Sequence, residues 1–163
     1  MEEEKNRKQK KITDVKLAFE KMSSWCGYQE RCQQEARDKL YEFGLWPEAV
    51  EEIIASLITE NFINEERFAK AYVRGKFRIK KWGRIKIKMG LKQKRISDSC
   101  IKTGMQEIDG DEYLVTLGNL IENKKRLLKS EKNKIQLKFK LMKFAQSKGF
   151  ETDLVMGVLK AGE

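Results

Sequence analysis

The chain has 163 residues, 35 of them lysine or arginine and 25 aspartate or glutamate, which gives a net charge of +10 and a pI of about 9.5. This length suits one domain or a short array of small modules, and the charge favours nucleic acid, an anionic membrane or an acidic protein surface as partner. The sequence has no histidine, no phosphate-binding glycine motif and no cysteine–histidine metal cluster. It is therefore predicted to be non-catalytic, with no cofactor and no bound metal.

The first eleven residues are charged throughout, and no apolar stretch follows them, so a flexible tail is expected rather than a secretory signal. The longest run without a charged residue, Tyr113 to Ile121, has nine residues, whereas a membrane span needs roughly 20. The protein is therefore expected in the cytoplasm, without a membrane partner. Cys26, Cys32 and Cys100 are expected there as reduced thiols, and their spacing matches no zinc motif.

Apolar residues at helical spacing predict a series of helices, the first over roughly residues 13–25. The second helix buries Ala36, Leu40 and Phe43. It ends at Gly44, a residue type that readily takes the left-handed conformation at a helix C-terminus. The chain has a single proline and no Asn-Gly or Asp-Gly turn, which also favours an all-α fold.

The third helix begins at Pro47 and has the clearest apolar stripe. Its inward residues, at positions i, i+3, i+4 and i+7, are Val50, Ile53, Ile54 and Leu57. Asn64 can cap the fourth helix. In that helix Phe68, Ala71 and Tyr72 are expected to face inward.

Charge is unevenly distributed along these helices. Residues 28–66 contain ten acids and three bases, whereas residues 74–95 contain eleven bases and no acid. A second basic segment, residues 124–148, has ten bases and one acid, Glu131. Like-charge segments are often ordinary solvated faces. Eleven cations without an acid nevertheless favour contact with a polyanion or an acidic protein.

The first basic segment includes K-W-G-R-I-K-I-K-M-G-L-K-Q-K-R-I, residues 81–96, whose alternation resembles a β-strand. No other alternating segment could pair with it, and a shift of 51 residues aligns Leu40 with Leu91, which makes the segment the middle copy of a helical repeat. A helix is therefore predicted, with Ile87 and Leu91 inward and the lysines outward. Arg95 replaces the glycine that ends the first copy, so a left-handed cap is not expected there.

A third copy near the C-terminus aligns Gly149 with Gly44. The predicted organisation is a charged tail, an N-terminal helix with the first three-helix repeat, a basic second repeat and a truncated third repeat. Their respective boundaries are 1–11, 12–81, 82–130 and 131–163.

Three segments resemble the RecX family of recombinase regulators: D-K-L-Y at 38–41 with Gly44 following, N-F-I-N-E-E-R-F-A-K-A-Y-V-R at 61–74, and K-W-G at 81–83. The resemblance covers about residues 13–159. It implies an elongated, curved all-α protein of about three tandem three-helix repeats. Such a protein binds the groove of the RecA filament on single-stranded DNA, inhibits its ATPase and strand exchange, and serves in recombination, DNA repair and the SOS response. Many family members also bind DNA directly, and a monomer is expected.

The cations of the two basic segments are the candidate contacts with the filament or with nucleic acid. They are Arg74, Arg78, Lys80, Lys81, Arg84, Lys86, Lys88, Lys92, Lys124, Lys125, Arg126 and Lys138. Phe68, Tyr72 and Trp82 are more simply packing residues than base-stacking ones. The alternative function is a basic helical nucleic-acid-binding protein without a filament target, and a passive scaffold is a third.

Overall fold

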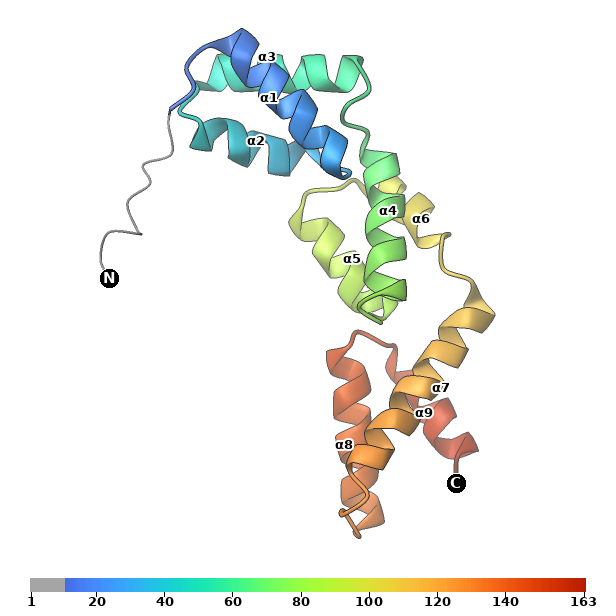
Figure 1. The fold of residues 1–163 in the computed structure, drawn as a ribbon. Coiled ribbons are helices and arrows are strands. Elements are labelled where there is room, and N and C mark those ends of the chain that lie inside the picture. The colour runs from blue at the N-terminus through green and yellow to red at the C-terminus, as the bar shows by residue number, and fades with distance from the viewer. Residues whose placement is uncertain (1–10) are drawn as a thin grey trace, which may run out of the picture. The chain divides into compact units, whose positions relative to one another are not determined.

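The computed structural model describes residues 11–163, which form nine α-helices and no β-strand (Figure 1). The helices are α1 (Val15–Tyr28), α2 (Gln33–Glu42), α3 (Pro47–Thr59), α4 (Glu65–Arg78), α5 (Arg84–Gln93), α6 (Asp98–Met105), α7 (Gly110–Leu127), α8 (Lys134–Ser147) and α9 (Thr152–Ala161). The all-α prediction is confirmed. The predicted tail, residues 1–11, lies outside the described residues except for Lys11.

The chain divides into two compact units, one ending at Phe68 and the other beginning at Ala69. In the first unit, α3 packs against α1 and α2, and Pro47 occupies the first helical turn, where no backbone N–H is needed. The predicted stripe of α3 is buried. Around it lie Ala18, Met22, Ala36, Leu40, Leu45, Ala49 and Ile63.

Side chains cap two of the helices that begin in the first unit. The Asp14 carboxylate accepts hydrogen bonds from the backbone N–H groups of Lys16 and Leu17 at the start of α1. The Asn64 side chain accepts one from the Arg67 N–H at 2.9 Å. The prediction that Asn64 caps the fourth helix is therefore confirmed.

The second unit contains α4 from Ala69 onward and helices α5–α9. Ala71 and Tyr72, both expected to face inward, are only partly buried. The Tyr72 hydroxyl lies against Gly90 of α5, where an added Cβ would overlap it. Gly104 of α6 similarly permits a close approach to Ala69, because an added Cβ would lie 3.0 Å from the Ala69 Cβ.

Residues 84–93 form helix α5 and not a strand, as predicted. Ile87 and Leu91 are fully buried. Ala36 and Leu40, which occupy the same two positions in the first repeat, are fully buried as well. Burying an aliphatic side chain of this size contributes roughly 1.5–3 kcal/mol. Core packing therefore fixes which side of α5 faces inward.

Helices α7, α8 and α9 pack against one another. Along α7 the inward residues are Tyr113, Leu117 and Ile121, each four residues after the last. The end of α8 is joined to the start of α5 through the backbone: the Gly83 N–H donates to the Lys148 carbonyl at 2.7 Å, and the Ile85 N–H donates to the Gly149 carbonyl at 3.0 Å.

The end of α5 differs from the prediction, because Arg95 has a φ of +58° and does take the left-handed conformation. Its N–H donates to the Lys92 carbonyl at 2.9 Å, and the Ile96 N–H donates to the Leu91 carbonyl at 3.2 Å. The same pair of hydrogen bonds follows α2 and α8, where the left-handed residue is glycine. The turn is kept without glycine because it satisfies two helix carbonyls and buries Ile96.

Arg95→Gly is expected to stabilise the second unit by about 1 kcal/mol, because a side chain in the left-handed region costs about that much. For a unit of this size the melting temperature should rise by roughly 4 °C or more. Thermal unfolding followed by circular dichroism measures the shift. Arg95→Ala is the matched control, since it removes the same charge but keeps the Cβ, and an equal gain in both variants would contradict the explanation.

Candidate functional site

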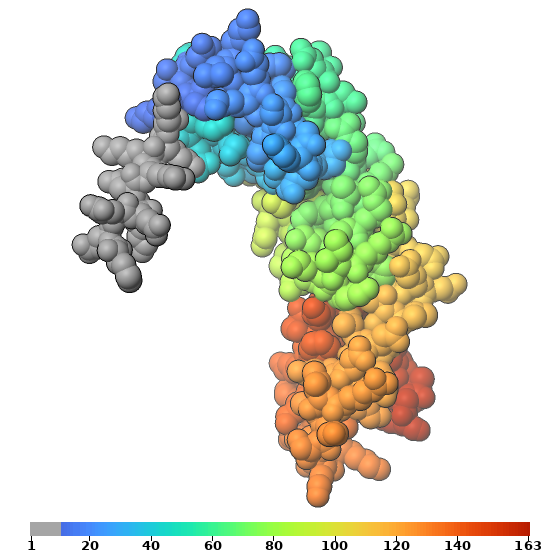
Figure 2. Space-filling model, in the orientation of Figure 1, coloured from blue at the N-terminus to red at the C-terminus, as the bar shows by residue number. Residues whose placement is uncertain are grey.

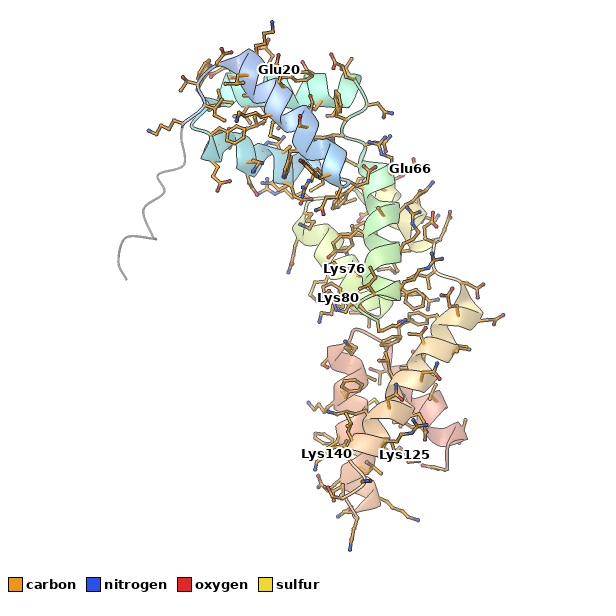
Figure 3. The ribbon with its side chains drawn as sticks, viewed as in Figure 1. Glu20, Glu66, Lys76, Lys80, Lys125 and Lys140 are labelled. Atoms are coloured by element: carbon orange, nitrogen blue, oxygen red, sulfur yellow. The ribbon has the colours of Figure 1, made fainter. Side chains whose placement is uncertain are left out.

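The two units have net charges of opposite sign. Residues 11–68 contain 7 bases and 12 acids, whereas residues 69–163 contain 24 bases and 10 acids, so their net charges are −5 and +14. All twelve candidate contact residues belong to the second unit. Figure 3 labels four cations of this unit, Lys76, Lys80, Lys125 and Lys140. A unit with this much uncompensated positive charge attracts anionic partners.

Five candidate residues at the end of α4 and along α5 are exposed and have no carboxylate partner among residues 11–163. We call them the unpaired α4–α5 cations: Arg78, Lys80, Lys81, Lys88 and Lys92. Lys88 and Lys92 are four residues apart and so lie on one side of α5. Ile85 and Met89 of the same helix are 48% and 55% exposed. The outward side of α5 therefore combines cations with apolar side chains.

Arg84 is held inside the second unit rather than presented to a partner. Its guanidinium pairs with Glu151 at 2.9 Å and lies 3.9 Å from the centre of the Tyr113 ring. Its backbone N–H donates to the Tyr113 hydroxyl at 3.0 Å, and that hydroxyl donates to the Glu151 carboxylate. Arg84 therefore has a structural role that joins α5, α7 and the start of α9.

Arg74 and Lys86 also have partners within the unit. Arg74 lies 3.4 Å from the Glu107 carboxylate, although its side chain is 42% exposed. The Lys86 ammonium lies 4.5 Å from the centre of the Trp82 ring, and Lys76 lies 4.8 Å from it. Trp82 is partly buried. These cation–π contacts help to fix the turn between α4 and α5.

The candidate residues on α7 and α8 also include some that are exposed without a partner and some that have a partner within the unit. Lys125 and Arg126 are exposed in the last turn of α7, where cations complement the helix dipole. Lys124 lies 5.1 Å from the Phe144 ring centre, and Lys138 lies 3.4 Å from the Glu163 carboxylate. Lys125 and Lys138 both line an apolar groove of about 570 Å³.

The described residues include no group of three side chains that could hold a metal ion and no helix long and apolar enough to cross a membrane. The three cysteines are free thiols. Burial raises the pKa of Cys32 to about 12 and also raises the pKa of Cys26, so neither thiol forms a reactive thiolate readily.

Sequence reasoning missed two features of this unit. The first is the group formed by Tyr113, Arg84 and Glu151, which no local pattern reveals because its members are far apart along the chain. The second is the contact of Lys76 with Trp82. Lys76 and Trp82 are six residues apart and flank the end of α4, and this spacing could have predicted the contact.

Comparisons of the sequence and the fold with known proteins all point to RecX proteins. A family model for the second three-helix domain of RecX matches residues 64–105, which contain α4, α5 and α6. This match begins ahead of the second repeat predicted from the sequence, 82–130. Regulatory protein RecX of Clostridium perfringens (strain SM101 / Type A) is 32% identical over 131 residues, 80% of this chain and 61% of the relative. That of Clostridium tetani (strain Massachusetts / E88) is 35% identical over 130 residues, 79% of this chain and 59% of the relative.

The chain thus spans about three fifths of the length of these relatives. The crystal structure of RecX from Lactobacillus salivarius is similar with a TM-score of 0.79 and 22% identity, covering 90% of this chain and 95% of that one. A second RecX crystal structure has a TM-score of 0.81 and 22% identity, with 90% and 71% covered. These two structures share the fold. The chain is therefore similar to RecX proteins, in sequence over about four fifths of its length and in fold.

Proposed function

We propose that this chain regulates the RecA recombinase by binding the RecA filament on single-stranded DNA and lowering its ATPase and strand-exchange activity. Similarity to RecX regulatory proteins supports the proposal, together with the net charge of the second unit. In this proposal the protein acts in the cytoplasm as a monomeric binding partner and catalyses no reaction.

The observation that carries the proposal is the set of unpaired α4–α5 cations. A cation already held by a carboxylate would have to give up that partner on binding, which reduces the net gain. Arg78, Lys80, Lys81, Lys88 and Lys92 have no such partner among the described residues. They are therefore the preferred contacts with phosphates of the filament's DNA strand or with acidic side chains of its protomers.

Ile85 and Met89 add a protein-directed component to the same side of α5. Exposed apolar side chains gain from burial against another protein, whereas a phosphate backbone offers them nothing. This combination favours a nucleoprotein filament over free DNA as the main target. A basic helical protein that binds only nucleic acid remains the alternative.

Lys88→Glu/Lys92→Glu is expected to weaken inhibition of the single-strand-dependent RecA ATPase. Roughly tenfold more protein should be needed for half inhibition, because two attractive charges become repulsive at an exposed contact. The measurement is ATP turnover by preformed filaments as protein is titrated in. Lys16→Glu/Lys21→Glu on α1 is the matched control, since it makes the same change in net charge on exposed residues of the first unit.

Equal inhibition by wild type and the α5 variant would show that these cations are not the contact. The nucleic-acid alternative is tested by binding to free single-stranded DNA. It requires affinity that falls by roughly 10³–10⁵ between 50 and 200 mM salt if 6–10 phosphates are neutralised. ATPase inhibition only at protein levels that coat the DNA would favour that alternative.

A further inference from the structure

Helix α8 carries two apolar stripes, and the core needs only one. Leu141 and Ala145 are buried against the neighbouring helices. Ile135, Phe139 and Met142, at positions i, i+4 and i+7, form a second stripe beside the buried one. Ile135 is 79% exposed and Phe139 is 56% exposed. Met142 is partly buried, whereas more than half of the Ile135 and Phe139 side chains is open to solvent.

The end of the α7–α8 hairpin carries further apolar side chains. Leu127, in the last turn of α7, is 77% exposed. Leu128, Phe139 and Phe144 line a shallow hollow of about 390 Å³ whose other lining residues are Lys124, Lys140 and Lys143. Figure 2 shows this part of the hairpin, in orange, projecting from the second unit. Apolar side chains are thus gathered at a projecting end and ringed by lysines.

The charge around this apolar surface has one sign. Residues 124–143 contain nine bases and one acid. That acid, Glu131, pairs with Lys140 at 2.7 Å, and this contact lowers its pKa. Lys132, Lys134 and Lys143 are exposed without a carboxylate partner among residues 11–163. Any partner of this surface must therefore be both anionic and able to take up apolar side chains.

We propose that the end of the α7–α8 hairpin binds the surface of a bilayer rich in anionic lipid. Ile135, Phe139 and Leu127 enter the boundary between headgroups and acyl chains, while the lysines extend to the anionic headgroups. Eight lysines and one arginine within residues 124–143 fit the composition of segments attracted to anionic leaflets. This peripheral contact needs no membrane-spanning helix.

Other anionic partners fit less well. A DNA backbone satisfies the lysines but leaves Leu127 and Ile135 in water, and only the Phe139 ring could stack on a base. An acidic protein would need a cleft shaped to receive side chains that project in this way. A bilayer accepts projecting side chains of any shape, so it uses both the charge and the apolar surface.

The test is co-sedimentation of the full chain with vesicles of phosphatidylcholine alone or mixed with phosphatidylglycerol. Binding is expected only to the mixed vesicles, and it should fall by about fivefold for each lysine neutralised, as measured with Lys132→Gln/Lys143→Gln. Ile135→Ser/Phe139→Ser keeps every charge and should abolish most of the binding. Val115→Ser/Met156→Ser removes two similarly exposed apolar residues from α7 and α9 and should leave binding unchanged.

Phe139→Trp supplies a second readout that does not depend on the serine variant. The emission of this tryptophan should shift to shorter wavelength with phosphatidylglycerol vesicles and stay unchanged with single-stranded DNA. Equal binding to both vesicle types, full binding by Ile135→Ser/Phe139→Ser, or a shift with DNA alone would each overturn the proposal. RecA ATPase inhibition is measured without lipid, so failure of either proposal leaves the other intact.

Discussion

Gly149→Ala is expected to lower the unfolding free energy of the second unit by roughly 2–5 kcal/mol, from strain in the left-handed region and from overpacking. Gly149 has a φ of +95°. A Cβ added there would lie only 2.6 Å from the backbone nitrogen of Lys86. The obstacle is backbone held by two hydrogen bonds between the start of α5 and the end of α8, so it cannot move aside as a flexible side chain would.

Urea unfolding followed by circular dichroism measures the loss. Gly157→Ala is the matched control: Gly157 lies within α9 and no heavy atom lies within 4 Å of an added Cβ. Alanine is better than glycine inside a helix by roughly 0.5–1 kcal/mol, so the control should be slightly stabilised. Unchanged stability of Gly149→Ala would mean that the α5–α8 backbone contact is not formed.

The helices and their inward faces could be predicted from the sequence because the signals are local. The stripe of α3 repeats with the helical period, and Asn64 directly precedes the helix that it caps. In α5 the choice between strand and helix followed from the alignment of Leu91 with Leu40, and both residues are fully buried. The α3 stripe and the Asn64 cap needed only neighbouring residues, whereas α5 also needed the repeat, which relates residues 51 positions apart.

The partners of the cations could not be predicted in this way. Residues 74–95 contain no acid, which made Arg74 and Arg84 look like free cations. The carboxylates that hold them, Glu107 after α6 and Glu151 before α9, belong to other parts of the chain and approach only when the unit folds. A charge count within one segment therefore overestimates the number of cations available to a partner.

Arg95 shows a different limit of sequence reasoning. Glycine at a helix end is a preference worth about 1 kcal/mol, and packing can exceed it. Burial of Ile96 and two backbone hydrogen bonds keep the left-handed turn in place with arginine there. The sequence prediction failed at Arg95 because it treated the preference for glycine as a strict rule.

Tyr113→Ala is expected to lower the unfolding free energy by roughly 3–5 kcal/mol, the range for removing a buried aromatic ring. Tyr113 is fully buried, and its ring centre lies 5.0 Å from that of Phe150 and 5.8 Å from that of Phe77. Tyr113→Phe keeps the ring and should cost roughly 1–3 kcal/mol, because the Arg84 N–H and the Glu151 carboxylate lose a partner. Tyr28→Phe, at a side chain 86% exposed, should change stability little.

The hydroxyl contribution should also depend on pH. Burial, and secondly the hydrogen bond to Glu151, raise the pKa of Tyr113 above its usual value. A raised pKa means that the folded protein retains the phenol proton where the unfolded chain has released it. The stabilisation is therefore complete below about pH 10, the ordinary tyrosine pKa, and declines as pH rises through the higher folded-state pKa.

The difference in unfolding free energy between wild type and Tyr113→Phe isolates this effect, because the other titrating groups are common to both proteins. It should be constant from pH 7 to about pH 10 and then shrink by about 1.4 kcal/mol per pH unit. Urea unfolding at a series of alkaline pH values measures it. A difference that stays constant well above pH 10 would show that the Tyr113 hydroxyl is accessible to water. The hydrogen bonds that join Arg84, Tyr113 and Glu151 would then not be formed.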